Sequence, residues 1–348
     1  MKKLLAVLLS VFMMVGLVAC SNNNEPTPTE SAQPTEQTTV EGTTKVGLGS
    51  VTSLKLTDAT EDAEASVQFA TTYALVVLDA EGKIVQAQFD VAQNTVAFDG
   101  AEANAVPTKL EKQYDYNMAG ASSLEKGEWF EQIAAFEAWV AGKTVEEVKN
   151  AETAVQGNGH EGGESPVDLA TSCTMATGDF VAALEKAAAS AVDANGATTF
   201  GFASVTGLKS EAATEDKDAK AQADTTISVV GLDGETIKVV ITDVAQNSAT
   251  VDAEGVVTGE AIPTKVEKQY DYNMAGSSSL EKGEWFEQAA AYNAWCVGKT
   301  AAEVEGAEVA VQGNAHEGSE SPVDLATSCT MATGDMTAAV VKAASVAK

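Results

Sequence analysis

The chain has 348 residues, of which 51 are acidic and 21 are basic, and its formal net charge is −30 at pH 7. Every basic residue is a lysine. A chain with no arginine and no basic stripe lacks the groups that follow a phosphate backbone, so we expect no nucleic-acid partner. The length that remains after the N-terminal segments described next predicts about two domains.

The N-terminus has the pattern of a secretory signal. Lys2 and Lys3 precede an apolar run over 4–19, which is short for a membrane span and ends in a small residue before Cys20. This pattern resembles a bacterial lipoprotein signal. The resemblance implies that 1–19 are removed and that Cys20 receives a lipid, so we expect an extracytoplasmic protein that this lipid anchors to the cell membrane.

Residues 20–44 predict the lipid anchor and a disordered linker. Asn, Pro, Thr, Glu, Gln and Ser dominate this segment, which has too few apolar side chains to bury a core. Beyond it the chain has three cysteines, Cys173, Cys296 and Cys329. An odd number does not predict a disulfide framework.

The rest of the chain is a duplication. Two blocks of the first half recur almost unchanged in the second half at one constant offset, namely 107–132 as 263–288 and 164–180 as 320–336. A solenoid would need shorter and more numerous units. The predicted repeats are 45–192 and 198–348, and we expect each to fold alone.

The front half of each repeat predicts strands. In the first copy, β-rich runs at 73–78 and 84–91 flank the turn sequence Asp-Ala-Glu-Gly, which is typical of a hairpin. The second copy has corresponding runs at 226–232 and 237–242 around Asp-Gly. Both copies therefore predict antiparallel pairing.

The back half of each repeat predicts helices. Apolar residues at helical spacing run from Trp129 to Val140, a short turn follows at 145–148, and a final helix covers about 179–190. In the second copy Cys296 takes the place of Val140, so we interpret it as an inert core thiol. Strands followed by helices favour the α+β class, as two tandem copies of a small sheet-plus-helices domain.

The segment before the final helix is the candidate site. Asp168, Thr171 and Thr174 follow one another at intervals of three, and the second copy repeats them as Asp324, Thr327 and Thr330. Hydroxyl-rich segments before helices are most often caps or turns. The pattern alone therefore leaves a structural role open, with Thr177 as the expected N-cap.

Asp168-x-x-Thr171-x-x-Thr174 resembles the flavinylation signature of extracytosolic FMN-binding domains, with Ser172-Cys173 where that family commonly has Gly-Ala. The block from Tyr114 to Thr144 is similar to the tandem flavin lipoproteins that Gram-positive bacteria use for extracellular electron transfer. The resemblance implies that a flavin transferase attaches FMN to Thr174 and Thr330 as a phosphoester. A phosphoester needs an accessible hydroxyl, which we expect both threonines to offer.

Aromatic residues in the same block are candidates to lie against the flavin ring. Tyr116 and Tyr272 belong to a segment without a clean period, which favours a functional loop. Trp129 and Trp285 belong to the helical apolar stripe, which favours the core. His160 and His316 have no second histidine at a ligand spacing, so no metal site is predicted.

The sequence therefore predicts a surface lipoprotein with one covalent FMN in each repeat. It would accept electrons from a membrane donor and relay them outward as a carrier, not as an enzyme that turns over a substrate. The alternative is a lipid-anchored binding or structural module whose repeats are cofactor-free.

Overall fold

The computed structural model describes residues 45–157, 163–313 and 319–348. Cys20, with the predicted signal, anchor and linker, lies outside these residues. The described residues form eight α-helices and four antiparallel sheets, which confirms the α+β class.

The first repeat contains a four-stranded antiparallel sheet in the order β3-β2-β1-β6. Its strands are β1 (Lys45–Thr57), β2 (Ser66–Leu78), β3 (Ile84–Ala97) and β6 (Val192–Asp193). The predicted hairpin is confirmed as β2 and β3, and both strands extend beyond the predicted runs. The Asp79 carboxylate accepts hydrogen bonds from the backbone N–H groups of Glu81 and Lys83, and Gly82 adopts φ of 79°. Glycine suits this left-handed turn position.

The second repeat contains the corresponding sheet in the order β10-β9-β8-β7. Its strands are β7 (Thr199–Glu211), β8 (Ala219–Asp233), β9 (Thr236–Val251) and β10 (Val257–Gly259). Each repeat also has a small two-stranded sheet, β4 (Thr153–Ala154) with β5 (Ser165–Pro166), and β11 (Val309–Val311) with β12 (Glu320–Pro322).

The helices occur in matching sets. The first repeat has α1 (Lys109–Lys112), α2 (Trp129–Val140), α3 (Val145–Lys149) and α4 (Gly178–Ala189). The second has α5 (Lys265–Lys268), α6 (Trp285–Cys296), α7 (Ala301–Glu305) and α8 (Gly334–Ser345). The helices predicted from the apolar spacing are confirmed. Cys296 is fully buried in the core of the second repeat, as interpreted from its place in the stripe.

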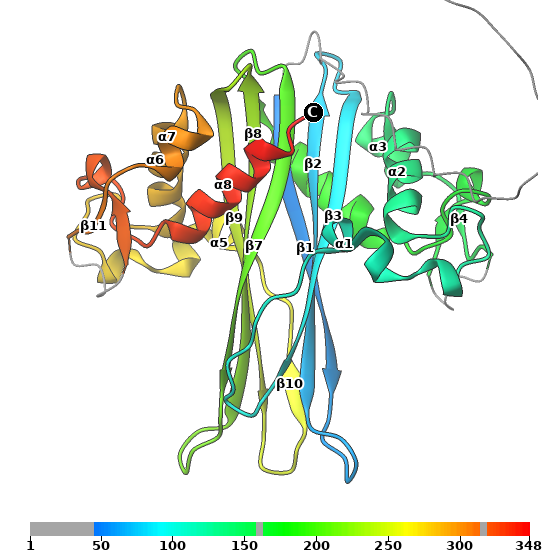
Figure 1. Ribbon diagram of the computed structural model, residues 1–348, viewed down its shortest axis with the longest axis horizontal. Coiled ribbons are helices and arrows are strands. Elements are labelled where there is room, and N and C mark those ends of the chain that lie inside the picture. The colour runs from blue at the N-terminus through cyan, green and yellow to red at the C-terminus, as the bar shows by residue number, and fades with distance from the viewer. Residues whose placement is uncertain (1–44, 158–162, 314–318) are drawn as a thin grey trace, which may run out of the picture. The chain divides into compact units, whose positions relative to one another are not determined.

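Helices cover the outer face of each four-stranded sheet (Figure 1). In the first repeat, Phe89 of β3 packs with Trp129 and Phe136 of α2 and with Phe180 of α4. The burial of β2 follows this cover: exposure alternates over its first residues, whereas its last eight residues are all buried. One face of β2 is covered along its length, and the helices cover the other face only near the strand end.

The inner faces of the two sheets pack against each other. One shared cluster joins Tyr73 and Leu75 of β2 to Phe200 and Phe202 of β7, and the Tyr73 and Phe202 ring centroids lie 5.1 Å apart. A second shared cluster joins the first halves of β2 and β8, which supply Phe69 and several alanines. All described residues belong to one compact unit. The two repeats therefore share hydrophobic core.

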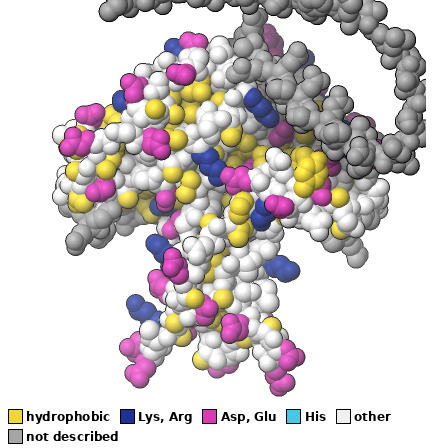
Figure 2. All heavy atoms as spheres, in the orientation of Figure 1, with side chains coloured by type: hydrophobic (Ala, Val, Ile, Leu, Met, Phe, Trp, Pro, Cys, Tyr) yellow, Lys and Arg dark blue, Asp and Glu magenta, His cyan; other side chains and the backbone are white. Residues whose placement is uncertain are grey.

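The surface is acidic, with lysines interspersed among more numerous carboxylates on the face that Figure 2 shows. Among the described residues, none of the helices has the length and apolar character needed to cross a bilayer. The three cysteines of this part of the chain are free and buried.

Candidate functional site

The candidate segment folds as a short 3-10 helix, Val167–Leu169, followed by an irregular stretch that leads into α4. Asp168 and Thr171 are exposed, whereas Thr174 is buried. The Trp139 indole Nε1 donates to the Asp168 carboxylate at 3.4 Å, and Trp295 donates to Asp324 at 3.3 Å. Asp168 therefore ties the segment to α2, and Thr171 remains free of this contact.

Thr174 is held by a buried amide of α2. Gln132 Oε1 accepts a hydrogen bond from the Thr174 backbone N–H at 2.9 Å, and Gln132 Nε2 donates to the Gly127 carbonyl at 3.1 Å and to Ser122 Oγ at 3.3 Å. The second repeat reproduces the main contact, since Gln288 Oε1 accepts the Thr330 N–H at 2.9 Å. A buried amide with these partners fixes the segment against α2.

Glycine lies against the side chain of each threonine. Gly157 has φ of 56°, and a Cβ atom placed on it would lie 3.0 Å from Thr174 Cγ2 and 2.6 Å from Ser123 Oγ. Gly313 has the same relation to Thr330. Only glycine fits both the left-handed backbone and this close approach. The Thr174 and Thr330 side chains are each 4% exposed, so the expectation of an accessible hydroxyl is wrong for this conformation.

A pocket of about 450 Å³ lies elsewhere, between the repeats, but the pocket next to the candidate segment is larger, about 870 Å³. Met175, the residue that follows Thr174, lines this pocket together with the first turns of α4. Lys109, Tyr116 and Trp129 line the same pocket. Polar and charged side chains line it as well, among them the carboxylates of Glu164, Asp179 and Glu185. A pocket of this size with aromatic side chains in its walls could hold a small molecule.

The residues at the start of α4, from Thr177 to Phe180, line this pocket. Thr177 occupies the N-cap, but its hydroxyl donates to the Glu164 carbonyl at 3.3 Å and makes no cap hydrogen bond. The predicted cap at Thr177 is therefore wrong in its side-chain role. Thr333 repeats this arrangement at α8. Uncapped N–H groups at a helix N-terminus favour an anion such as a phosphate.

A lysine and aromatic rings meet in another part of the pocket lining. Lys109 Nζ lies 5.0 Å from the centroid of Tyr116 and 5.7 Å from that of Trp129. Lys265 lies 5.1 Å from Tyr272 in the second repeat. Tyr116 is half-buried and belongs to the pocket, as a ring-contact candidate requires, and Trp129 is buried in the core as expected while also reaching this wall.

The structure adds site residues that the sequence reasoning missed. They are the buried amides Gln132 and Gln288, the lysines Lys109 and Lys265, and the glycines Gly157 and Gly313. The amides and the lysines lie in the near-identical blocks 107–132 and 263–288, so the similarity of the two copies was the available signal. The same blocks include the Tyr-Asp-Tyr segment.

Other reactive groups do not contribute to the site. Burial raises the pKa of the Cys173 and Cys329 thiols to about 11, which keeps both protonated and unreactive. His160 and His316 lie outside the described residues. Within the described part of the chain, no three His, Cys, Asp or Glu side chains converge to hold a metal ion.

No protein-family model matches the chain, and comparisons with curated proteins and with solved structures found no match either.

Proposed function

We propose that the protein carries one FMN in each repeat, joined through its phosphate to Thr174 and Thr330, and relays electrons between a membrane donor and the cell exterior. Bound flavin would supply the electron-transfer chemistry, while the protein supplies position and electrostatics. The proposal draws on the resemblance of the Asp168 to Thr174 segment and on the site next to it.

The pocket beside Thr174 is the observation that carries the proposal. The N–H groups at the start of α4 would donate hydrogen bonds to the phosphate, because the Thr177 hydroxyl leaves them uncapped. Tyr116 would lie against the flavin ring. Lys109 adds a positive charge that would attract an anionic cofactor, although the carboxylates of Glu164, Asp179 and Glu185 line the same pocket. A covalent bond also retains the cofactor without an arginine, which this chain lacks.

The buried threonine sets a condition on attachment. Thr174 packs against Gly157 and is almost fully covered, so the hydroxyl must be reached before the repeat closes or after the segment opens. Asp168 and Thr171 are exposed and are therefore available to a flavin transferase in the closed state.

The test uses the full chain, coexpressed with a flavin transferase. The transferase would take FMN from FAD, so that the Thr Oγ–phosphorus bond forms, the FAD pyrophosphate bond breaks and AMP leaves. Intact mass should rise by two FMN groups, and peptide mapping should place them on Thr174 and Thr330. Thr174→Val and Thr330→Val should each remove one FMN, because valine keeps the shape and lacks the hydroxyl nucleophile. Ser172→Ala is the matched control, since it removes a neighbouring hydroxyl and should leave both groups in place.

The rival proposal is a lipid-anchored binding or structural module with cofactor-free repeats, and the burial of both threonines favours it. The two proposals predict a different visible absorbance for the purified protein. A flavin carrier absorbs visible light as a yellow protein, whereas protein that stays colourless and unmodified beside a competent transferase would support the cofactor-free module.

The lipid anchor is a separate part of the proposal. Cys20→Ala should abolish labelling by a radioactive fatty acid and release the protein from membranes, because the thiol is the expected lipid acceptor. Cys173→Ala serves as the control and should keep the label. Labelling that persists in Cys20→Ala would contradict the anchor.

A further inference from the structure

The short helix α1 connects the pocket of the first repeat to the second repeat. It has four residues and no buried side chain, so contacts with its surroundings determine where it lies. Lys109 of α1 reaches the pocket, the Leu110 N–H donates to Asp90 Oδ1 at 3.0 Å, and Glu111 points the other way, toward the second repeat.

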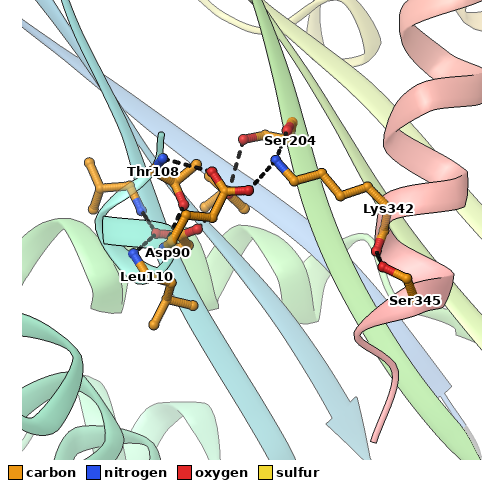
Figure 3. A network of polar contacts seen from close by, with 9 residues as sticks. Asp90, Thr108, Leu110, Ser204, Lys342 and Ser345 are labelled. Atoms are coloured by element: carbon orange, nitrogen blue, oxygen red, sulfur yellow. Dashed lines mark hydrogen bonds and ion pairs between the residues drawn. The ribbon is translucent and has the colours of Figure 1, made fainter. Parts of the chain in front are cut away.

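The Glu111 carboxylate makes contacts with both repeats. Its Oε2 accepts the Thr108 N–H at 2.8 Å within the capping box, and its Oε1 pairs with Lys342 Nζ of α8 at 2.5 Å. Lys342 Nζ also donates to the Ser204 carbonyl at 2.9 Å, which fixes the ammonium over β7. Figure 3 shows Lys342 reaching from α8 toward the segment that carries Thr108 and Leu110.

A chain of hydrogen bonds through the shared core also connects Ser204 of the second repeat with α1. Ser204 Oγ donates to Tyr73 Oη at 3.0 Å, and Tyr73 Oη donates to Asp90 Oδ2 at 2.9 Å. Asp90 holds the Leu110 N–H, so α1 is bound both to β3 of its own repeat and to α8 of the other.

The second repeat has the reciprocal contact. Glu267 of α5 accepts the Thr264 N–H at 2.9 Å and pairs with Lys186 of α4 at 2.7 Å, while Lys265 lies over Tyr272. Lys186, Thr264 and Glu267 line the pocket of about 450 Å³ between the repeats. Each final helix therefore contacts the short helix of the opposite repeat, which is the arrangement of an isologous pair.

We infer that each repeat positions the site lysine of the other: Lys342 fixes α1 and thereby Lys109, and Lys186 fixes α5 and thereby Lys265. Lys342 and Lys186 are positioning residues in this scheme, because neither lines the large pocket of the first repeat. Each site therefore depends on a contact from the other repeat. A substitution of Lys342 or Lys186 should change the position of the lysine in the opposite repeat.

Amide hydrogen exchange on the full chain tests this assignment. Lys342→Met keeps the aliphatic stem and removes the charge, so exchange at 109–116 should rise roughly fivefold, the factor that corresponds to about 1 kcal/mol for a half-exposed ion pair. Exchange at 265–272 should not change. Lys186→Met should give the opposite pattern, with faster exchange at 265–272 alone.

Two further variants make the result specific. Lys342→Arg keeps the charge and should retain protection at 109–116, and Lys149→Met removes the ion pair with Glu185 inside the first repeat and should leave α1 unchanged. Faster exchange confined to the substituted helix, an equal rise in both repeats, or no change at 109–116 would overturn the inference.

A second readout rests on the proposed function. In flavin-loaded Thr330→Val, which would carry only the first flavin, Lys342→Met should shift the flavin absorbance band and Lys186→Met should not. An absence of flavin would overturn the proposed function and leave the exchange test intact, whereas loaded protein with an unshifted band would count against the positioning role alone.

Discussion

Two matched aspartates show how one residue anchors a loop to a sheet. Asp90 and Asp243 lie at the same place on β3 and β9, and each accepts one backbone N–H from the following short helix, that of Leu110 or of Val266. The copies differ in the opposite strand, where Tyr73 faces Asp90 and Ile227 faces Asp243. Thr264 Oγ1 donates to Asp243 at 2.6 Å, and Thr108 makes the matching side-chain hydrogen bond with Asp90. Asp90 has in addition the hydrogen bond that Tyr73 donates.

Burial makes these carboxylates sensitive to pH. Desolvation raises the pKa of Asp243 to about 6, against the hydrogen bonds from Thr264 and Val266 that lower it. A folded-state pKa above the unfolded value means that the folded protein binds the proton more tightly. The stabilising effect is therefore complete below about pH 4 and is lost as the pH rises through about 6. Desolvation shifts the pKa of Asp90 in the same direction.

We expect Asp243→Asn to flatten this profile. The free energy of unfolding, measured in urea between pH 4 and pH 7, should fall less steeply in the variant, because asparagine keeps the carbonyl acceptor and does not ionise. Asp216→Asn removes an exposed carboxylate of the same repeat and should keep the wild-type slope. Equal slopes in wild type and Asp243→Asn would refute the assignment.

At the scale of elements, the final helix of each repeat packs directly on the backbone of a strand, at a glycine that has no side chain to separate the two. A Cβ on Gly47 of β1 would lie 1.8 Å from the Ala187 carbonyl oxygen of α4, and one on Gly201 of β7 would lie 2.1 Å from that of Ala343 in α8. These contacts are closer than any real Cβ makes, so the glycines permit the helix to approach. This approach also brings Lys186 and Lys342 to the opposite repeat.

Gly47→Ala should therefore push α4 away from β1. We expect a loss of about 2 kcal/mol in the free energy of unfolding, as for overpacked cores, measured by urea denaturation. Gly207→Ala is the matched control, because Gly207 lies in β7 with open space around its Cβ position and should change stability by less than about 0.5 kcal/mol. Equal effects of the two substitutions would mean that α4 does not require Gly47.

At the scale of the molecule, the two repeats complete each other. The inner clusters draw Leu75 and Phe69 from one repeat and Phe200 and Ala221 from the other, so separation exposes apolar faces on both sheets. The duplication in the sequence predicts that each repeat folds alone. The shared core leads us to expect the opposite, because exposed apolar sheet faces associate or aggregate.

Separated pieces test this directly. Residues 45–197 and 198–348, each expressed alone, should self-associate or aggregate in light scattering and should lack the cooperative melt of the full chain. Coexpression should restore a one-to-one complex with that melt. A monomeric half that melts cooperatively at the temperature of the full chain would show that the shared core is dispensable.

The local elements follow from the sequence alone. β-rich runs on both sides of the turn at Asp79 predicted the β2–β3 hairpin, and the helical spacing from Trp129 to Val140 predicted α2, because both signals depend on residues that are close along the chain. The duplication also marked the segment around Thr174 as a place to examine. The function assigned to that segment remains a proposal.

What covers each face follows from the packing of the elements. The β-rich composition of β2 predicts a strand, but it does not say that the other sheet covers one face and that helices cover the other near the strand end. Three contacts of the sites join residues that are distant along the chain. Thr174 packs against Gly157, Gln132 accepts the Thr174 N–H, and Lys342 pairs with Glu111. Such contacts depend on how the elements pack together, so no local pattern could have predicted them.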